Sequence, residues 1–183
     1  MSETFSFQPT LHGESISLRP MAESDFDGLF ACASSKKVWA GHPNPDRYKE
    51  PVFRKYFESA IDSRAAVVVT DNSTGEIIGF SRYYLESTIP DDISIGFTFL
   101  SCEYWGGETN FQLKNLMLDY AFRFFDVVWF HVSPSNIRSQ KATLKIGAVF
   151  SHEELLKLSG KDELWYCYKI GKGEWVKILQ TPR

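Results

Sequence analysis

Two adjacent glycines, Gly106 and Gly107, stand directly before a long helical pattern in the stretch CEYWGGETNFQLKNLMLDYAFRFF. The first turn of a helix leaves several backbone N–H groups without partners and carries partial positive charge, so it favours anions, above all phosphate. Glycine has no Cβ to block a ligand, and it adopts positive φ readily, so that successive N–H groups can point inward. The pair therefore predicts a phosphate cradle, although an ordinary tight turn would use the same residues.

Two better-known phosphate loops are missing from the sequence. It contains neither G-x-x-x-x-G-K-[ST] nor a G-x-G-x-x-G that opens a strand–helix–strand unit. The sequence therefore gives no support to nucleotide hydrolysis or to redox chemistry with a dinucleotide.

The elements around the glycine pair must hold this loop in place. The next helix is predicted by an apolar stripe at i, i+3, i+4, i+7, i+8 and i+11, for which core packing is a sufficient reason. The stripe consists of Leu113, Leu116, Met117, Tyr120, Ala121 and Phe124. Before it, the pattern predicts a strand over 15–19, a helix from 24 or 25, a helix over about 51–61, a hairpin around 71–75 and a strand over 93–101.

In the last of these strands, alternation places Ile93, Ile95, Phe97 and Phe99 on one face. After the striped helix, VVWFHVS predicts a strand, SPSNIRSQKATLKIGA a loop and a helix that ends at Gly147, and ELWYCYKI a final strand. A helix between two strands forms a crossover, so at least one strand pair should be parallel. We expect an α+β fold with a mixed, mostly antiparallel sheet flanked by helices.

The composition limits the kind of protein. With 183 residues and 43% hydrophobic content, the chain should form one domain over residues 1–183. It lacks the roughly 18-residue apolar run of a membrane helix and the features of a signal peptide, so we expect a cytoplasmic protein without a membrane partner. Three separated cysteines predict no metal site, and a net charge of −3 argues against nucleic acid and suits a cationic substrate.

Three stretches occur in an order that is typical of one superfamily: LHGESISLRPMAESDFDGLF, IGFTFLSCEYWGG and NIRSQKATLKIGA. Together they resemble the GCN5-related N-acetyltransferase (GNAT) superfamily, and within it the RimJ/RimL-like branch, which acetylates protein N-termini and small amines. The likeness runs from Leu11 to Ile170. It implies a GNAT fold in which two parallel strands splay apart and acetyl-CoA, the cosubstrate, binds in the gap.

The resemblance also implies which residues contact the coenzyme. The strand Ile93–Leu100 would pair its free backbone groups with the pantetheine arm, the loop after it would hold the pyrophosphate, and Val128–Val132 would form the second wall. The residues so implied are Phe97, Phe99, Leu100, Trp105, Gly106, Gly107, Glu108, Thr109, Asn110, Asn136 and Ser139.

Some positions depart from the superfamily pattern. The phosphate loop is usually Q/R-x-x-G-x-G/A, and these positions are Glu103, Gly106 and Glu108 here. A carboxylate repels a diphosphate unless it points to solvent, so Glu108 either faces outward or weakens coenzyme binding. Where many members have a catalytic tyrosine this chain has Thr143, which leaves Ser139 as the candidate acid. A serine in the first turn of a helix can also simply bond to the backbone, and Asn136 fits an N-cap.

The general base is not fixed by the sequence. His131 could accept the proton of the attacking amine, although a structural histidine would fit the same strand. Glu153 and Glu154 are further candidates, and His42 could contact the acceptor. We expect acetyl transfer to a primary amine, either a protein N-terminus or a small molecule. A non-catalytic acyl-CoA-binding module and a domain without ligand are the alternatives, and a homodimer is compatible with the exposed strand edges.

Overall fold

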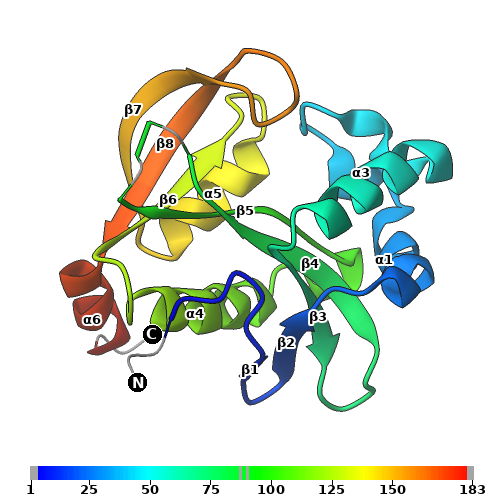
Figure 1. Cartoon of the computed structure of the whole chain (residues 1–183), viewed down its shortest axis with the longest axis horizontal. Coiled ribbons are helices and arrows are strands. Elements are labelled where there is room, and N and C mark those ends of the chain that lie inside the picture. The colour runs from blue at the N-terminus through cyan, green and yellow to red at the C-terminus, as the bar shows by residue number, and fades with distance from the viewer. Residues whose placement is uncertain (1–3, 87, 90, 181–183) are drawn as a thin grey trace.

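The computed structural model describes residues 4–86, 88–89 and 91–180 as one eight-stranded sheet flanked by helices (Figure 1). The strands are β1 (Leu11–His12), β2 (Ile16–Pro20), β3 (Ala66–Asp71), β4 (Ile77–Tyr84), β5 (Ile93–Leu100), β6 (Val127–Val132), β7 (Val149–Leu156) and β8 (Glu163–Gly171). The helices are α1 (Phe26–Ala33), α2 (Lys36–Trp39), α3 (Glu50–Asp62), α4 (Thr109–Ala121), α5 (Ile137–Lys145) and α6 (Lys172–Gln180), with 3-10 turns η1 (Glu23–Asp25), η2 (Pro45–Tyr48) and η3 (Cys102–Tyr104).

The sheet order is β1-β2-β3-β4-β5-β6-β8-β7, and every pairing is antiparallel except β5–β6. That parallel pair holds only at two positions, Ile93 opposite Val128 and Ser94 opposite Trp129. Beyond Ser94 the two strands diverge, so most of β5 has β4 as its only strand neighbour. The predicted α+β fold with two splayed parallel strands is thereby confirmed.

A β-bulge at Phe97 bends β5 where it leaves β6. Phe97 has a φ of +57°, and the register with β4 shifts between Phe80 and Arg82. A bulge inserts one extra residue into a strand and so reverses the alternation of faces beyond it. The prediction that the four alternating residues share one face is therefore wrong, because Ile93 and Ile95 belong to one core cluster and Phe99 to another.

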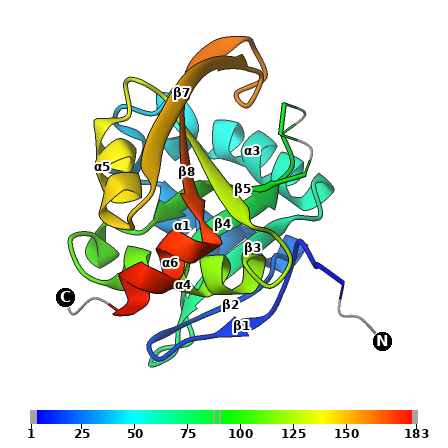
Figure 2. The same ribbon diagram turned by 90° about the vertical axis from the view of Figure 1, so that its left-hand side faces the viewer.

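Two hydrophobic cores lie on opposite faces of the sheet. Figures 1 and 2 show α4 and α6 on one face, where Met117 and Trp175 are buried, while α1 and α3 cover the other face around Phe53. The apolar stripe of α4 is confirmed, with Leu113, Met117, Tyr120 and Ala121 buried and Leu116 and Phe124 partly buried. The helix starts directly after the glycine pair and is fixed by the core beneath it.

The strand β1 and the helices α2 and α6 are among the elements that the sequence patterns did not predict. The strand β1 spans two residues, too few for a periodic signal. The helix α6 is held by tertiary contacts: the indole Nε1 of Trp175 donates to Asp119 Oδ1 over 2.6 Å, and Gly147, with a φ of +94°, lies against Ile178. None of the helices in the described ranges is both long and apolar enough to cross a bilayer.

Candidate active site

A cleft of about 330 Å³ lies where β5 and β6 diverge. Its walls come from β5, β6, the loop before α4, the first turns of α5, the segment 38–47 and the loop between β7 and β8. Ten of the twelve predicted site residues line it: Phe97, Phe99, Leu100, Trp105, Gly106, Gly107, Asn110, His131, Asn136 and Ser139. Glu108 and Thr109 do not, and their contact with a coenzyme remains a prediction.

The glycine pair forms an open rim of this cleft. Gly106 has a φ of +77°, and a Cβ added to Gly106 or Gly107 would meet no atom within 4 Å. Within the described chain, no backbone carbonyl accepts from the amides of Gly106, Gly107 or Asn110. Bare amides at the start of a 13-residue helix, with no side chain over them, fit an anion such as the diphosphate of coenzyme A.

The acidic residues of the loop turn away from this rim. Glu108, the N-cap residue of α4, is exposed and does not line the cleft, and neither does Glu103. Of the two alternatives for Glu108, the structure favours the outward one. A carboxylate at this position also interacts favourably with the positive end of the helix.

The rim is braced by an arginine from α5. The Arg138 guanidinium lies 4.1 Å from the centre of the Trp105 ring and donates to the carbonyls of Lys37 and Val38 in α2. The Trp105 indole in turn donates to the Leu100 carbonyl over 3.0 Å. These contacts fix the position of a positive charge beside the glycine loop.

Lys114 is a buried lysine in the gap between the strands, and sequence reasoning missed it. Its side chain is only 7% exposed, and Nζ donates to Thr98 Oγ1 over 2.6 Å. Burial lowers the pKa of Lys114 from 10.5 to about 7. A signal was present in the sequence, since Lys114 precedes Met117 and Leu118 by three and four residues and so shares their buried helix face.

His131 lies on β6 and faces the cleft. It is 9% exposed, and its Nδ1 is 2.6 Å from the hydroxyl of Tyr84, which also lines the cleft. Burial lowers the pKa of His131 to about 4, so the imidazole is neutral near pH 7. The contact with Tyr84 occupies Nδ1 and leaves Nε2 as the ring nitrogen for other partners.

The start of α5 brings the second motif to the cleft. Asn136 is the N-cap, since its Oδ1 accepts from the Ser139 amide over 3.2 Å. The Ser139 hydroxyl has no hydrogen-bond partner among the described residues, and Thr143, 7% exposed, lies one turn further along the same wall. The capping role is therefore present, and the roles of Asn136 and Ser139 toward a coenzyme remain predictions.

The other carboxylate candidates are remote from the cleft. Glu153 and Glu154 lie on β7, and no Asp or Glu lines the cleft anywhere in the described ranges. Glu154 instead approaches His152, and together with Cys167 these residues place three potential metal ligand atoms within 4.8 Å of one another. None of the three lines the cleft, and burial raises the pKa of the Cys167 thiol to about 11, which disfavours the thiolate that would bind a metal.

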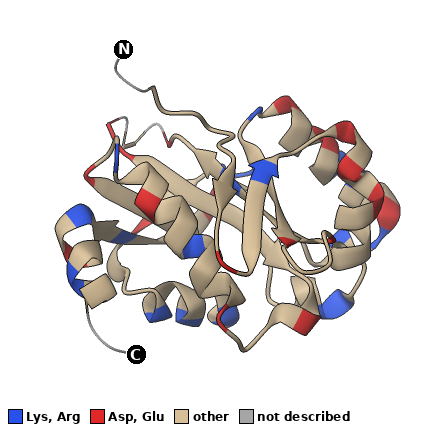
Figure 3. Ribbon diagram, turned by 90° about the horizontal axis from the view of Figure 1, so that it is seen from below, with Lys and Arg blue, Asp and Glu red and all other residues tan. Residues whose placement is uncertain are grey.

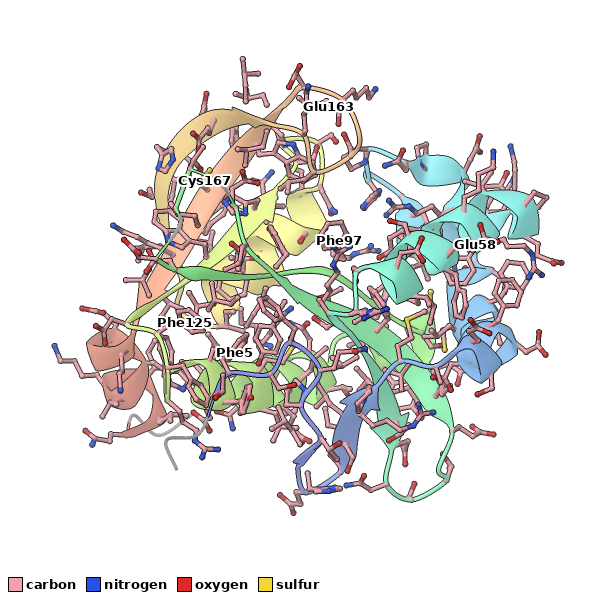
Figure 4. The ribbon with its side chains drawn as sticks, in the orientation of Figure 1. Phe5, Glu58, Phe97, Phe125, Glu163 and Cys167 are labelled. Carbon is pink, nitrogen blue, oxygen red and sulfur yellow. The ribbon has the colours of Figure 1, made fainter. Side chains whose placement is uncertain are left out.

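A further part of the cleft lining comes from the segment before α3. In Figure 1 the loop between β7 and β8 reaches toward this segment, and Leu158 and Ser159 from that loop line the cleft with His42 and Arg47. Figure 4 shows Phe97, at the bulge, between α5 and α3. This part of the lining, formed by the segment from His42 to Arg47 with Leu158 and Ser159, differs chemically from the glycine rim, and we call it the second mouth of the cleft.

Comparison with known proteins agrees with this geometry. A family model described as an acetyltransferase (GNAT) domain matches residues 15–149. A GCN5-related N-acetyltransferase from Brucella melitensis has a similar fold, with a TM-score of 0.78 and 17% identity over 94% of this chain and 83% of that one. No curated protein sequence matches the chain.

Two solved structures carry more specific names. The ribosomal-protein-S5-alanine acetyltransferase from Vibrio fischeri is 18% identical, with a TM-score of 0.64 over 91% of this chain and 98% of that one. Mycobacterium smegmatis RimJ, solved in complex with CoA-disulfide, is 15% identical, with a TM-score of 0.64 over 87% of this chain and 83% of that one. At these identities the likeness shows the fold.

Proposed function

The chain belongs to the family of GNAT acetyltransferase domains, and from this premise we propose that it transfers the acetyl group of acetyl-CoA to a primary amine. The observation that carries the proposal is the cleft between the splayed strands β5 and β6, which has an uncovered Gly106-Gly107 rim at one end. The similarity to an S5-alanine acetyltransferase and to RimJ supports an amine as the acceptor.

Acetyl-CoA would supply the activated acetyl group as a thioester. The amides of Gly106, Gly107 and Asn110 would bind its diphosphate, with the charge of Arg138 nearby. The unpaired part of β5 offers backbone groups to the pantetheine arm. Holding an amine and a thioester in register would supply most of the rate enhancement, an effect on the order of 7–11 kcal/mol in favourable cases.

Two groups in the cleft can handle protons near pH 7. His131 is neutral there and can accept a proton at Nε2. Lys114, with a pKa of about 7, is protonated in roughly half of the molecules at pH 7 and can donate from Nζ to an oxygen in the gap. The Ser139 hydroxyl lines the cleft and has no partner among the described residues, and it would donate a proton to the thiolate of the leaving coenzyme.

The proposal is tested by incubating the purified protein with acetyl-CoA and a panel of amines and peptides. We expect release of free thiol that depends on the amine, and acetylation of that amine by mass spectrometry. Coenzyme binding without turnover across the panel would instead favour an acyl-CoA-binding module, which Thr143, at the position of the usual tyrosine, would also suit. Calorimetric titration with coenzyme A separates these outcomes from a domain that has lost its ligand.

A further inference from the structure

Arg47 is a positively charged residue that lines the cleft and, among the described residues, contacts aromatic rings instead of a carboxylate. Its guanidinium carbon lies 3.9 Å from the centre of the Tyr56 ring and 5.3 Å from that of Trp39, and within the described residues no carboxylate pairs with it. The Tyr56 hydroxyl donates to the carbonyl of Phe97 at the bulge of β5 over 3.0 Å. The Tyr56 ring therefore lies between the Arg47 guanidinium and the bulge of β5.

The polar neighbour of Arg47 is His42, and it cannot satisfy the guanidinium. Nδ1 of His42 accepts from the Asn44 amide over 2.9 Å, so the proton of a neutral imidazole must lie on Nε2. Burial and the nearby charge of Arg47 lower the pKa of His42 to about 3, which keeps the ring neutral. Nε2 lies 3.3 Å from Arg47 Nη1, so two N–H donors face each other and both lack an acceptor.

The charged residues that line the cleft also favour an anionic ligand. It is lined by two arginines, two lysines and two histidines and by no described Asp or Glu, although the chain carries a net charge of −3. The described acidic residues lie outside the cleft lining, and Figure 3 shows them spread over the helices and loops of the outer surface. Arg138 braces the glycine rim, Lys114 bonds Thr98, and Lys145 lies at the far end of α5, so Arg47 is the cation beside His42.

Glu163 is the carboxylate whose charge reaches His42, and it is already engaged. One oxygen bonds Lys161 over 2.8 Å and the other accepts from Ser159. Figure 4 places Glu163 near the end of the β7–β8 loop, and it does not line the cleft. A ligand must therefore bring the missing acceptor.

We propose that Arg47 and His42 bind a carboxylate of the acceptor, so that the amine substrate carries a carboxylate close to its amino group. A guanidinium and one neighbouring imidazole N–H offer several donors and a single positive charge, which matches one carboxylate. This inference rests on the proposed acetyl transfer. The carboxylate can come from a free amino acid or from an acidic residue at the start of a peptide.

The activity test uses acceptors that differ only in the carboxylate. Free amino acids are compared with their amides, and C-terminally amidated peptides that begin with Asp or Glu are compared with those that begin with Asn or Gln. We expect kcat/KM to favour the carboxylate in one of these sets by roughly 10- to 100-fold, the effect of a charged hydrogen bond. In Arg47→Met the ratio should fall toward one, mainly through KM, while Arg47→Lys should keep part of the preference.

Arg54→Met is the matched control. Its guanidinium also lies 3.9 Å from an aromatic ring, that of Phe26, but it is on the outer side of α3 and does not line the cleft. This variant should keep the wild-type preference. The inference would be overturned if the wild-type protein acetylated both members of each pair equally well, or if Arg47→Met lost affinity for coenzyme A, which would assign Arg47 to the coenzyme.

A binding measurement separates this inference from the proposed catalysis. Calorimetric titration of the protein with coenzyme A present should detect N-acetyl amino acids or N-acetylated acidic peptides, and the affinity should fall at least tenfold when the carboxylate is amidated. Arg47→Met should remove that difference. Carboxylate-dependent binding without turnover would refute the enzyme and keep the site. Turnover that does not depend on the carboxylate would refute the carboxylate site and keep the proposed acetyl transfer.

Discussion

Replacing Lys114 by methionine should stabilise the protein, and the gain should depend on pH. The side chain is 7% exposed, and burial lowers its pKa from 10.5 to about 7 without a compensating charge. Because the unfolded chain holds this proton more tightly than the folded one, the buried lysine destabilises the fold fully below about pH 7. The penalty disappears as the pH rises toward 10.5.

The size of the effect follows from the two pKa values. Their difference, about 3.5, corresponds to an upper limit of about 5 kcal/mol at roughly 1.4 kcal/mol per unit. Between pH 7 and pH 9 the gap in unfolding free energy between Lys114→Met and wild type should shrink by about 2 kcal/mol. Thr98 Oγ1 keeps a partner in the variant, since Ser81 Oγ lies 2.8 Å away.

Urea unfolding followed by tryptophan fluorescence at pH 6, 7, 8 and 9 measures this gap, with free coenzyme excluded. Lys55→Met, on the exposed surface of α3, reports what removal of a surface lysine does. A gap that stays constant from pH 6 to pH 9 would refute the reasoning, because it would mean that water in the cleft solvates the ammonium and its pKa is not lowered. The same variant should also lose turnover if Nζ donates to a group in the gap.

Three further variants test the coenzyme end of the cleft. Gly107→Ala should change the free energy of unfolding by less than about 0.5 kcal/mol, because its Cβ meets open space, and should weaken calorimetric binding of coenzyme A about tenfold by covering the amides. Asn136→Ala should lower stability by about 1 kcal/mol in thermal unfolding through loss of the α5 cap, and an unchanged stability would deny the cap. Ser139→Ala should lower kcat with little change in coenzyme affinity, and an unaltered rate would remove the hydroxyl from the mechanism.

The coenzyme end of the cleft could be anticipated because its signals are local. The glycine pair, the stripe of α4 and the cap at Asn136 each depend on a few consecutive residues, and these elements fold as their patterns predict. The bulge at Phe97 could not, since IGFTF alternates perfectly and only pairing with β4 reveals the extra residue. The alternating pattern therefore predicted the strand β5, which forms a wall of the cleft, but it placed Phe99 on the wrong face of that strand.

The second mouth depends on contacts between segments that are distant in the chain, so no local pattern predicts it. The sequence predicts that His42 could contact the acceptor, but it gives no reason to place Arg47 there, because an arginine in a proline-rich loop is normally solvated. Its partner ring comes from Tyr56 on α3, and the neutral state of His42 depends on burial by the whole loop. Only the folded chain shows that two donors meet without an acceptor.

The positive charges in the cleft bear on the missing general base. An ammonium near Arg47 and Lys114 is destabilised relative to the neutral amine, so the pKa of the acceptor should fall below the value of about 8 that is usual for an α-amino group. A lower pKa of the acceptor amine means that a weaker base is sufficient to remove its proton. A neutral His131 with a pKa of about 4, useless toward an amine in water, becomes adequate as a relay to solvent. The acceptor's carboxylate would offset the repulsion on binding and cancel part of the pKa decrease that Arg47 causes, so Lys114 would account for the rest of it. A cleft without Asp or Glu is then consistent with catalysis, because the amine needs only a weak base.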